Sequence, residues 1–471
     1  MTTPQEGDVI WDAAREVIAR IADDRRAAPG RIVAIASPEE ASALAGKAAP
    51  GAPRALADVI ADAADIFSHR VRMDHPRFYG FIPSPASPLA VVGDLLTSGF
   101  NAHAGSWMQS SGPSAIEQGL IAWLARRAGL PAEAGGLFVS GGSMANLTGL
   151  MLARDRMLPP ERRREGVAYV SSQTHSSVAK GLGILGFLPD QIRKIAVDDR
   201  RRIDLGALAD ACAADRAAGL LPFAIVANCG TTNTGSIDDL NGIADLAARE
   251  RLWMHVDGAY GASVALSKSH RALVDGLGRA DSLSWDAHKW LFQTYGCGMV
   301  LVRDRRHLVE SFANNAEYLQ DAIAGMETPN FWDYGVELTR PARAMKLWFT
   351  LQVLGEKALG AAIDHGFALA EALEAALAPL ADWQIVSAAQ LGIVTFRYVP
   401  PGRGAEELDA LNSQIAREMV EQNLGAPLTT KLDDMVVMRA CTISPDATFD
   451  DIRAMARSMD QLAREIALRQ G

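Results

Sequence analysis

Lys289 is the residue of this sequence with the clearest chemical potential. It follows a predicted buried strand in the segment 284–290, and Trp285 and Trp290 flank it. Lysine is rarely buried without a role, and a desolvated lysine has a lowered pKa that lets its amine form an imine with a carbonyl group. Taken alone, Lys289 could equally be a surface lysine that follows a strand, which is the commoner situation.

Asp257 ends the apolar run 252–256, and small residues follow it, including Ala259. A residue in this position of a parallel α/β sheet lies at the carboxyl edge, where ligands bind. A carboxylate there could keep the ring nitrogen of pyridoxal phosphate (PLP) protonated, so that the ring accepts carbanion electrons. Ala259 would leave room for the flat ring. By itself, Asp257 could also be a helix cap or a turn residue.

Three polar turns could complete such a site. The turn 140–143 contains two glycines and opens a predicted helix, so its backbone N–H groups could bind a phosphate, although this signal is weak alone. His175 follows another strand and could stack on the cofactor ring or simply cap a helix. Thr232 lies in the loop 230–235, which offers hydroxyl groups or is a plain polar loop.

Together these five pieces resemble the PLP-dependent group II amino-acid decarboxylases, which include aromatic L-amino-acid decarboxylase and glutamate decarboxylase. The resemblance runs from the segment 74–78 to the C-terminal part of the chain, and its His-Lys-Trp and His-Val-Asp-Gly-Ala-Tyr motifs are specific. It implies that Lys289 forms the Schiff base with PLP, that Asp257 pairs with the pyridinium and that His175 stacks on the ring. It also implies that the rest of the cofactor is held by Gly142, Ser143, Thr232, Ala259 and His288.

The same resemblance implies which residues border the substrate. Phe81 and Ser84 would lie beside it, and Trp107 would approach the site of a neighbouring subunit. Arg439, on the strand-like run 435–442, could bind an α-carboxylate in a decarboxylase or in an aminotransferase.

Two residues depart from the family pattern. Asp286 stands where the animal aromatic enzymes have an asparagine beside the phosphate, which places a second negative charge near an anion unless the side chain points away. Phe331 aligns with the loop tyrosine that is thought to protonate the carbon that loses CO₂. Tyr334, three residues on, could take its place. Without a proton donor here, oxygen could intercept the carbanion and yield an aldehyde.

The elements that must position these residues follow a βαβ rhythm between positions 113 and 303. Short apolar runs alternate with helical patterns, which predicts a mainly parallel sheet covered on both faces. We expect the α/β architecture of PLP fold type I, with an N-terminal helical arm over 1–84, a large PLP-binding domain over 85–345 and a small C-terminal α/β domain over 346–471. The predicted strands are 137–139, 167–170, 192–196, 223–227, 252–256, 282–285 and 299–302, with 391–398 and 435–442 in the small domain.

The composition excludes several other classes of protein. The chain has 471 residues, a net charge of −10 and 22% charged residues, and it shows no basic patch interleaved with aromatics, so nucleic acid is not expected as a partner. No apolar run reaches the length of a membrane span, and the polar N-terminus does not look like a signal peptide. The four cysteines lack the spacing of a zinc site or a disulfide framework, which favours a cytoplasmic protein without a metal.

We therefore predict a homodimeric enzyme that uses PLP to decarboxylate an L-amino acid, with an aromatic substrate favoured, to the amine and CO₂. The residues Ile10, Ala14, Val17, Ile18 and Ile21 give the predicted helix 8–23 an apolar stripe, which we expect to pack on the partner subunit. Three alternatives remain open: decarboxylation-dependent oxidative deamination to an aldehyde, an aminotransferase of the same fold, and a PLP-binding regulatory protein without turnover.

Overall fold

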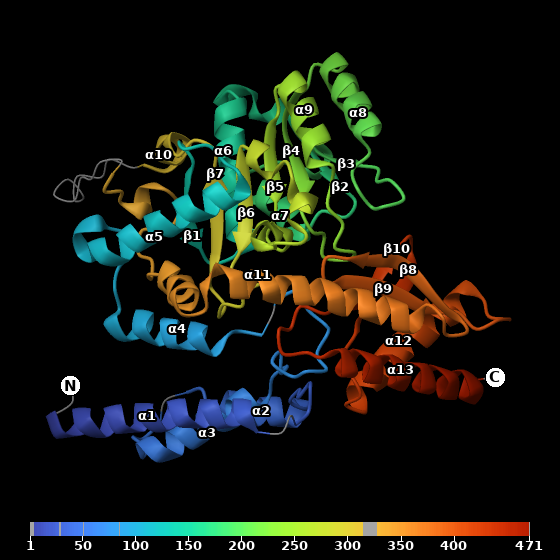
Figure 1. The fold of residues 1–471 in the computed structure, drawn as a ribbon. Coiled ribbons are helices and arrows are strands. Elements are labelled where there is room, and N and C mark those ends of the chain that lie inside the picture. The colour runs from blue at the N-terminus through green and yellow to red at the C-terminus, as the bar shows by residue number, and fades with distance from the viewer. Residues whose placement is uncertain (1–3, 28–29, 50, 84, 314–326, 471) are drawn as a thin grey trace.

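A seven-stranded sheet forms the centre of the molecule (Figure 1). The computed structural model describes residues 4–27, 30–49, 51–83, 85–313 and 327–470. The strand order is β1-β7-β6-β5-β4-β2-β3, and only β7 runs antiparallel to its neighbours. The seven strands are β1 (Gly135–Val139), β2 (Gly166–Ser171), β3 (Ile192–Ile195), β4 (Leu221–Asn228), β5 (Trp253–Asp257), β6 (Ser282–Asp286) and β7 (Gly298–Val302).

Helices cover both faces of this sheet, as the βαβ rhythm predicted. Residues of β4 alternate between two apolar clusters: Ile225 and Ala227 pack with one set of helices, whereas Ala224 and Val226 pack with the other. The first face carries α5 (Trp107–Ala128), α8 (Leu205–Ala217), α9 (Leu240–Glu250) and part of α11 (Ala344–Leu377), and the second carries α6 (Gly142–Met157), α7 (Ser176–Ile184) and α10 (Arg306–Phe312). The predicted fold class, PLP fold type I, is confirmed.

The C-terminal part forms a second sheet, which is antiparallel and has the strand order β10-β11-β9-β8. Its strands are β8 (Trp383–Gln390), β9 (Ile393–Tyr398), β10 (Leu428–Leu432) and β11 (Met435–Cys441), and it packs with α12 (Ala405–Glu421) and α13 (Phe449–Gln470). The sequence predicted only the two inner strands. The backbone of α11 leaves the helical conformation at Gly355, so α11 consists of two helical stretches that meet at a kink.

The long helix α11 joins the two sheets. It packs on α4 (Pro88–Phe100) and α5 near its start and on β8 and α13 further along, and Figure 1 shows it running from beneath the large sheet to the small one. The expected domain boundaries at 84/85 and 345/346 remain predictions. The described chain contains no helix long and apolar enough to cross a membrane, and the four cysteines are buried free thiols.

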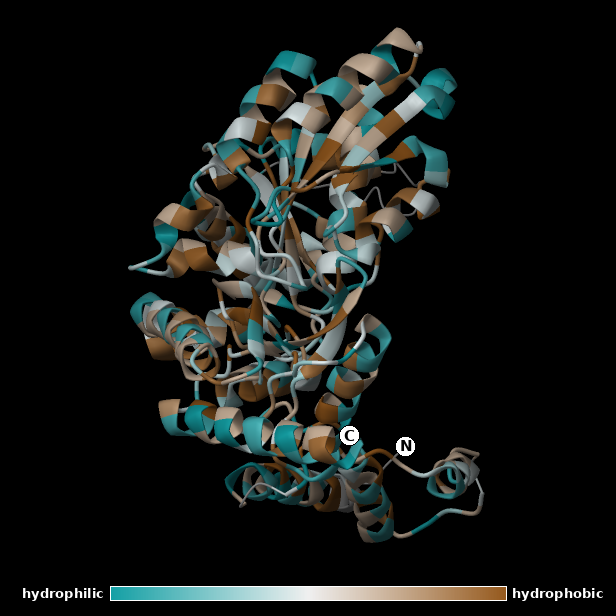
Figure 2. Ribbon diagram, turned by 90° about the vertical axis from the view of Figure 1, so that its right-hand side faces the viewer, coloured by the Kyte–Doolittle hydropathy of each residue, from teal (hydrophilic) through white to brown (hydrophobic). Residues whose placement is uncertain are grey.

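An N-terminal arm of three helices lies apart from the large sheet: α1 (Pro4–Arg26), α2 (Pro38–Gly46) and α3 (Leu56–Ser68) (Figure 1). On α1, Ile10, Ile18 and Ile21 of the predicted stripe are each 44–45% exposed, and Trp11 is 64% exposed. Figure 2 shows hydrophobic residues along the strands of the large sheet and also on helices at the molecule's lower edge. This arm keeps apolar side chains in contact with solvent, in contrast to the two sheets.

Candidate active site

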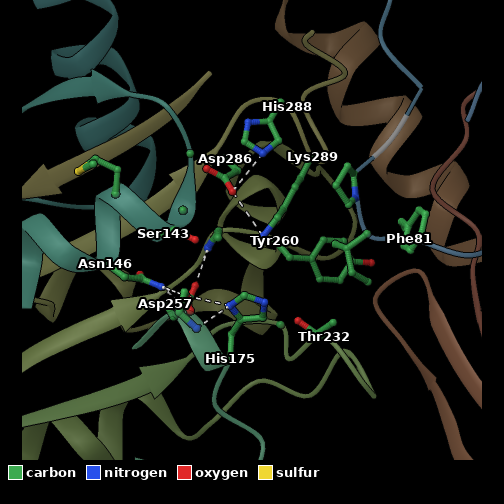
Figure 3. Close-up of a pocket in the computed structure, with 18 of the residues that line it drawn as sticks. Phe81, Ser143, Asn146, His175, Thr232, Asp257, Tyr260, Asp286, His288 and Lys289 are labelled. Atoms are coloured by element: carbon green, nitrogen blue, oxygen red, sulfur yellow. Dashed lines mark hydrogen bonds and ion pairs between the residues drawn. The ribbon is translucent and has the colours of Figure 1, made fainter. Parts of the chain in front are cut away.

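A cavity of about 600 Å³ opens at the carboxyl edge of the large sheet. The ends of β1, β2, β4, β5 and β6 meet there, as expected for parallel strands, and the segment 81–83 and the strand β11 close the opposite side. Its volume is in the range typical of cofactor and substrate sites. Figure 3 shows its side chains, and the predicted residues among them are Phe81, Gly142, Ser143, His175, Thr232, Asp257, Ala259, His288, Lys289 and Arg439.

Lys289 lies in the turn that follows β6, and its side chain is 20% exposed. Its Nζ is 3.4 Å from Oδ2 of Asp286, and the same oxygen is 3.5 Å from Nε2 of His288. The carboxylate of Asp286 therefore points into the cavity, and the expectation that it could point away is wrong. Asp286 is only 2% exposed, and its Oδ1 has no hydrogen-bond partner among the described residues.

Asp257, the last residue of β5, is held as a hydrogen-bond acceptor. Its Oδ2 accepts from Nδ2 of Asn146 at 2.9 Å, and its Oδ1 accepts from Oγ of Ser284 at 3.2 Å and from the backbone N–H of Ala259 at 3.3 Å. Three donors therefore converge on this one carboxylate. Asp257 is thus suited to accept a further N–H group from inside the cavity.

A buried chain of hydrogen bonds fixes the orientation of Asn146. The indole N–H of Trp253 can only donate, and it donates to Oγ of Ser282 at 2.8 Å. Ser282 therefore donates to Nδ1 of His255 at 2.8 Å, and Nε2–H of His255 donates to Oδ1 of Asn146 at 3.0 Å. The amide of Asn146 is left to donate to Asp257. Burial lowers the pKa of His255 to about 4, which keeps this imidazole neutral.

His175 stands at the start of α7, where it caps the helix, and its stacking on the cofactor ring stays a prediction. Its Nδ1 accepts the backbone N–H of Ser177 at 3.2 Å and lies 2.8 Å from Oγ of Ser177, so it caps the helix. Its ring also lines the cavity (Figure 3). Burial lowers the pKa of His175, and with Nδ1 engaged as an acceptor the neutral ring carries its proton on Nε2.

Close packing of glycines forms a cradle at the N-terminus of α6. A Cβ on Gly142 would lie 2.8 Å from Oδ2 of Asp286 and 3.0 Å from Cβ of Ala259, so only glycine fits there. Within the described chain, no side chain caps this helix, which leaves its first N–H groups available to an anion. Ser143, the next residue, also lines the cavity.

Arg439 faces the cavity from β11 and is 7% exposed. Its guanidinium donates to the carbonyl oxygens of Gly80 and Thr232, while its Nε has no hydrogen-bond partner among the described residues. Burial lowers the pKa of Arg439. A buried guanidinium bonded only to carbonyl oxygens retains the capacity to bind a carboxylate.

Among the described residues, three that were expected at the site do not line this cavity: Phe331, Tyr334 and Trp107. Phe331 is 1% exposed and Tyr334 is 5% exposed, and the two rings pack edge to face at 5.5 Å in the core beneath β1. Neither side chain therefore lines the cavity of its own chain in this structure, and their expected part in proton transfer stays a prediction. Trp107 starts α5, where its N–H donates to Asn330 at 2.9 Å, and Ser84 lies outside the described residues.

Sequence reasoning missed Asn146 and Tyr295, which also line the cavity. Asn146 lies one turn into a helix whose neighbouring residues are largely buried, and a fully buried asparagine requires hydrogen-bond partners. This need for partners was the signal by which the sequence could have marked Asn146 as a site residue. Tyr295 is 62% exposed and lies in a turn, where no pattern marks it.

These residues fit PLP. The cradle at Gly142 suits a phosphate, the acceptor Asp257 suits a pyridinium N–H, and Nζ of Lys289 lies between them within reach of an aldehyde. The small Ala259 and the flat ring of His175 both line the cavity, and both suit contact with a planar group.

Comparisons with known proteins agree with this geometry. Residues 38–399 match the family described as the pyridoxal-dependent decarboxylase conserved domain. An aromatic-L-amino-acid decarboxylase of Bacillus atrophaeus is 42% identical over 86% of this chain and 84% of its own length, and an L-2,4-diaminobutyrate decarboxylase of Rhizobium meliloti (strain 1021) is 34% identical over 88% and 83%. The crystal structure of Oryza sativa TDC with PLP and tryptamine is similar with a TM-score of 0.92 and 26% identity, covering 99% of each chain. The chain belongs to the pyridoxal-dependent decarboxylases and is a PLP-dependent carboxy-lyase that acts on an amino acid.

Proposed function

We propose that this enzyme decarboxylates an aromatic L-amino acid and releases the amine. The observation that carries this proposal is the distribution of charge in the cavity. Both carboxylates of the described lining, Asp257 and Asp286, lie at the cofactor end, whereas the opposite wall contains Phe81, Ile82 and Pro83. A diamino acid would bring a second ammonium group, which needs a carboxylate there. An aromatic side chain finds an apolar and aromatic wall instead.

Lys289 is proposed to hold PLP through its Nζ, with the phosphate on Gly142, Ser143 and His288. Asp257 is proposed to bind the pyridine N–H, and the chain through Asn146 keeps it in place. PLP, when bound, supplies a ring that withdraws electrons from the carbon that loses CO₂. His175 is proposed to lie against one face of the ring, Ala259 against the other, and Thr232 near the ring's hydroxyl group. The Nε2–H of His175 is then the donor that faces the reacting carbon.

Arg439 is proposed to bind the α-carboxylate of the substrate. Arg439 lines the cavity, and among the described residues its guanidinium donates only to the carbonyl oxygens of Gly80 and Thr232. A carboxylate that is held there is oriented, and the side chain of the substrate is directed towards Phe81. Trp107 is proposed to reach the cavity of a neighbouring subunit.

The product is proposed to be the amine rather than the aldehyde. The aldehyde-forming alternative depended on Phe331 occupying the place of a proton-donating tyrosine at the reacting carbon. In this chain Phe331 packs in the core, where the guanidinium of Arg340 lies 5.2 Å from its ring centre. Its lack of a hydroxyl group therefore gives no reason to expect a missing proton.

One set of incubations tests the proposal. The PLP-loaded protein is incubated separately with L-tryptophan, L-tyrosine, L-phenylalanine and L-2,4-diaminobutyrate, and CO₂, hydrogen peroxide and the masses of the products are measured. We expect an aromatic amine with no peroxide. Faster turnover of L-2,4-diaminobutyrate, or peroxide in amounts equal to CO₂, would refute the substrate or the product. Borohydride reduction should attach the cofactor to Lys289, and Lys268→Ala, at an exposed lysine, should leave that attachment unchanged.

We also propose that the enzyme is a homodimer that works in the cytoplasm. Support comes from the exposed apolar residues of α1 and from Trp107, which lies outside the cavity of its own chain. The four buried free thiols are compatible with a reducing compartment.

A further inference from the structure

Asp286 presents an electrostatic problem for the proposed phosphate site. Its carboxylate is 2% exposed and lies against the glycine turn of α6, where a Cβ on Gly142 would meet Oδ2 at 2.8 Å. A Cβ on Gly298 of β7 would meet Oδ1 at 2.3 Å, so both oxygens lie between the cradle and β7. A phosphate ester with nearly two negative charges would therefore bind next to a buried carboxylate. Like charges in a desolvated site disfavour each other strongly.

His288 has a fixed tautomer that bears on this problem. Its Nδ1 lies 3.1 Å from the carbonyl oxygen of Cys297, which can only accept, so Nδ1 carries a proton. In the neutral ring, Nε2 therefore has no proton, and this atom lies 3.5 Å from Oδ2 of Asp286. Burial lowers the pKa of His288, so the ring is neutral before an anion binds. Neutral His288 has no donor to offer the phosphate.

The other charged or titratable groups around Asp286 do not offset the repulsion between its carboxylate and the phosphate. On its own segment Lys289 lies 3.4 Å away, and it stays engaged with the cofactor when PLP is bound. From α7, His175 is neutral because burial lowers its pKa. Cys297, which precedes β7, is a neutral thiol since burial raises its pKa to about 12, and Lys346 of α11 pairs with Asp94 at 2.8 Å. On α6, the residues near Asp286 are Gly142 and Ser143, and neither has a charged side chain.

We infer that the Asp286–His288 pair couples phosphate binding to the uptake of one proton, which is taken from solvent onto Nε2 of His288. The imidazolium then lies beside both anions, and its Nε2–H becomes a donor for the phosphate. Asp286 acts as a positioning residue that stabilises this charged ring. The inference rests on the proposed function, because it assumes that the phosphate of PLP binds at Gly142, Ser143 and His288.

The consequence is a pH dependence of cofactor affinity that asparagine at this position would not produce. Above the pKa of His288 in the free enzyme, the dissociation constant of a phosphorylated ligand should rise about tenfold per pH unit, since one proton is bound with each ligand. With Asp286→Asn the amide can donate to the phosphate directly. The dissociation constant should then change little between pH 7 and pH 8.

Calorimetry on the full-length enzyme freed of cofactor tests this. The probe is PLP itself, which engages Lys289, and pyridoxal, which has the same aldehyde and lacks the phosphate, is the control for protons taken up at the ring nitrogen or on reaction with Lys289. Heats measured at pH 7.5 in buffers of different ionisation enthalpy give the number of protons taken up. We expect about one phosphate-dependent proton for the wild type and close to none for Asp286→Asn and for His288→Gln.

Four results would overturn the inference. Absence of phosphate-dependent proton uptake in the wild type does so without any variant, so it does not depend on whether a variant folds. Unchanged uptake in Asp286→Asn would remove the role of Asp286, and full uptake in His288→Gln would place the proton on the phosphate itself. Equal affinity for the phosphorylated and unphosphorylated probes would instead show that the proposed phosphate site is wrong, and the inference with it. None of these measurements involves turnover.

Discussion

A single buried side chain, Arg439, can make the enzyme bind its substrate more tightly than its product. The substrate carries an α-carboxylate and the amine product does not. If Arg439 binds that carboxylate, its contribution is present for the amino acid and absent for the amine. The bonds that it donates to the carbonyl oxygens of Gly80 and Thr232 are present in both cases.

We therefore expect Arg439→Gln to weaken binding of the amino acid about 10- to 100-fold, the range of a hydrogen bond to a charged group. Binding of the corresponding amine should change less than about threefold. The measurement is competitive displacement by each ligand on the PLP-loaded variant and wild type. Equal weakening of both ligands would show that Arg439 only supports the wall of the cavity.

His255 links the pH stability of the enzyme to the position of Asp257. Its pKa falls from 6.5 to about 4 on folding, because the ring is fully buried. The unfolded chain therefore binds a proton at a higher pH than the folded chain. The resulting stability is present above pH 6.5 and is lost as the pH falls from 6.5 through 4, by about 3 kcal/mol.

Glutamine can replace both hydrogen bonds of His255, since its oxygen accepts from Ser282 and its amide donates to Asn146, and it does not titrate. We expect the urea midpoint of His255→Gln to fall less than that of the wild type between pH 6.5 and pH 4.5. Both proteins are compared at one protein concentration and in the same buffers. Parallel curves for the two proteins would contradict the neutral state assigned to His255.

The residues of the cavity could be predicted from the sequence where they directly follow the end of a strand. Lys289, Asp257 and His175 each follow a strand of the large sheet, and the carboxyl-edge rule then brings them together. Asn146 was missed because its role depends on the partner that tertiary packing gives it. The position of the Phe331 side chain was not predicted, because an alignment of the loop gives the sequence register but not the direction of the side chain.

At the scale of elements, an ion pair that is fully excluded from solvent joins α5, β1 and the segment before α11. The guanidinium of Arg340 lies 2.7 and 3.0 Å from the two carboxylate oxygens of Glu117, and both side chains are 0% exposed. Arg340 also donates to the carbonyl oxygens of Ala104 and Phe138. The pair fixes how β1, and with it the cradle of α6, sits against α5.

Removing one partner leaves the other charge buried without compensation. We expect Glu117→Leu or Arg340→Met to lower the free energy of unfolding by about 3–5 kcal/mol. The double variant Glu117→Leu with Arg340→Met should recover a large part of that loss, because neither buried charge remains. Chemical denaturation of the four proteins measures the coupling. Losses that simply add in the double variant would show that the two side chains act independently.

The strands of the small sheet show why some elements escape sequence analysis. β9 and β11 are the inner strands and read as apolar runs, which is what predicted them. β8 and β10 are the edge strands, and their residues alternate between partly buried and exposed, with polar residues among them. A half-exposed edge strand lacks the continuous apolar run that marks an inner one.

At the scale of the whole molecule, the arm leaves its apolar side chains uncovered in the single chain. Trp11 and Ile18 on α1 and Phe67 on α3 are 45–70% exposed. An isolated helical arm of this kind has no core of its own, and a two-fold interface would bury both copies. This is the basis of the proposed homodimer.

We expect the double variant Trp11→Asp with Ile18→Asp to shift the enzyme from dimer to monomer in sedimentation equilibrium. The matched control is Asp12→Asn with Arg15→Gln, which changes exposed polar residues of the same helix. Catalytic activity should fall together with the dimer fraction. A wild-type protein that is monomeric and fully active would contradict the proposal.

The two walls of the cavity differ in how much sequence change each can tolerate. At the cofactor end, Gly142 and Gly298 leave no space for even a methyl group. Phe81 on the opposite wall and Tyr295 beside His288 are 45% and 62% exposed, so their side chains can be exchanged without disturbing a packed core. The substrate preference can therefore change in evolution, or through a library randomised at these two positions, while cofactor binding stays the same.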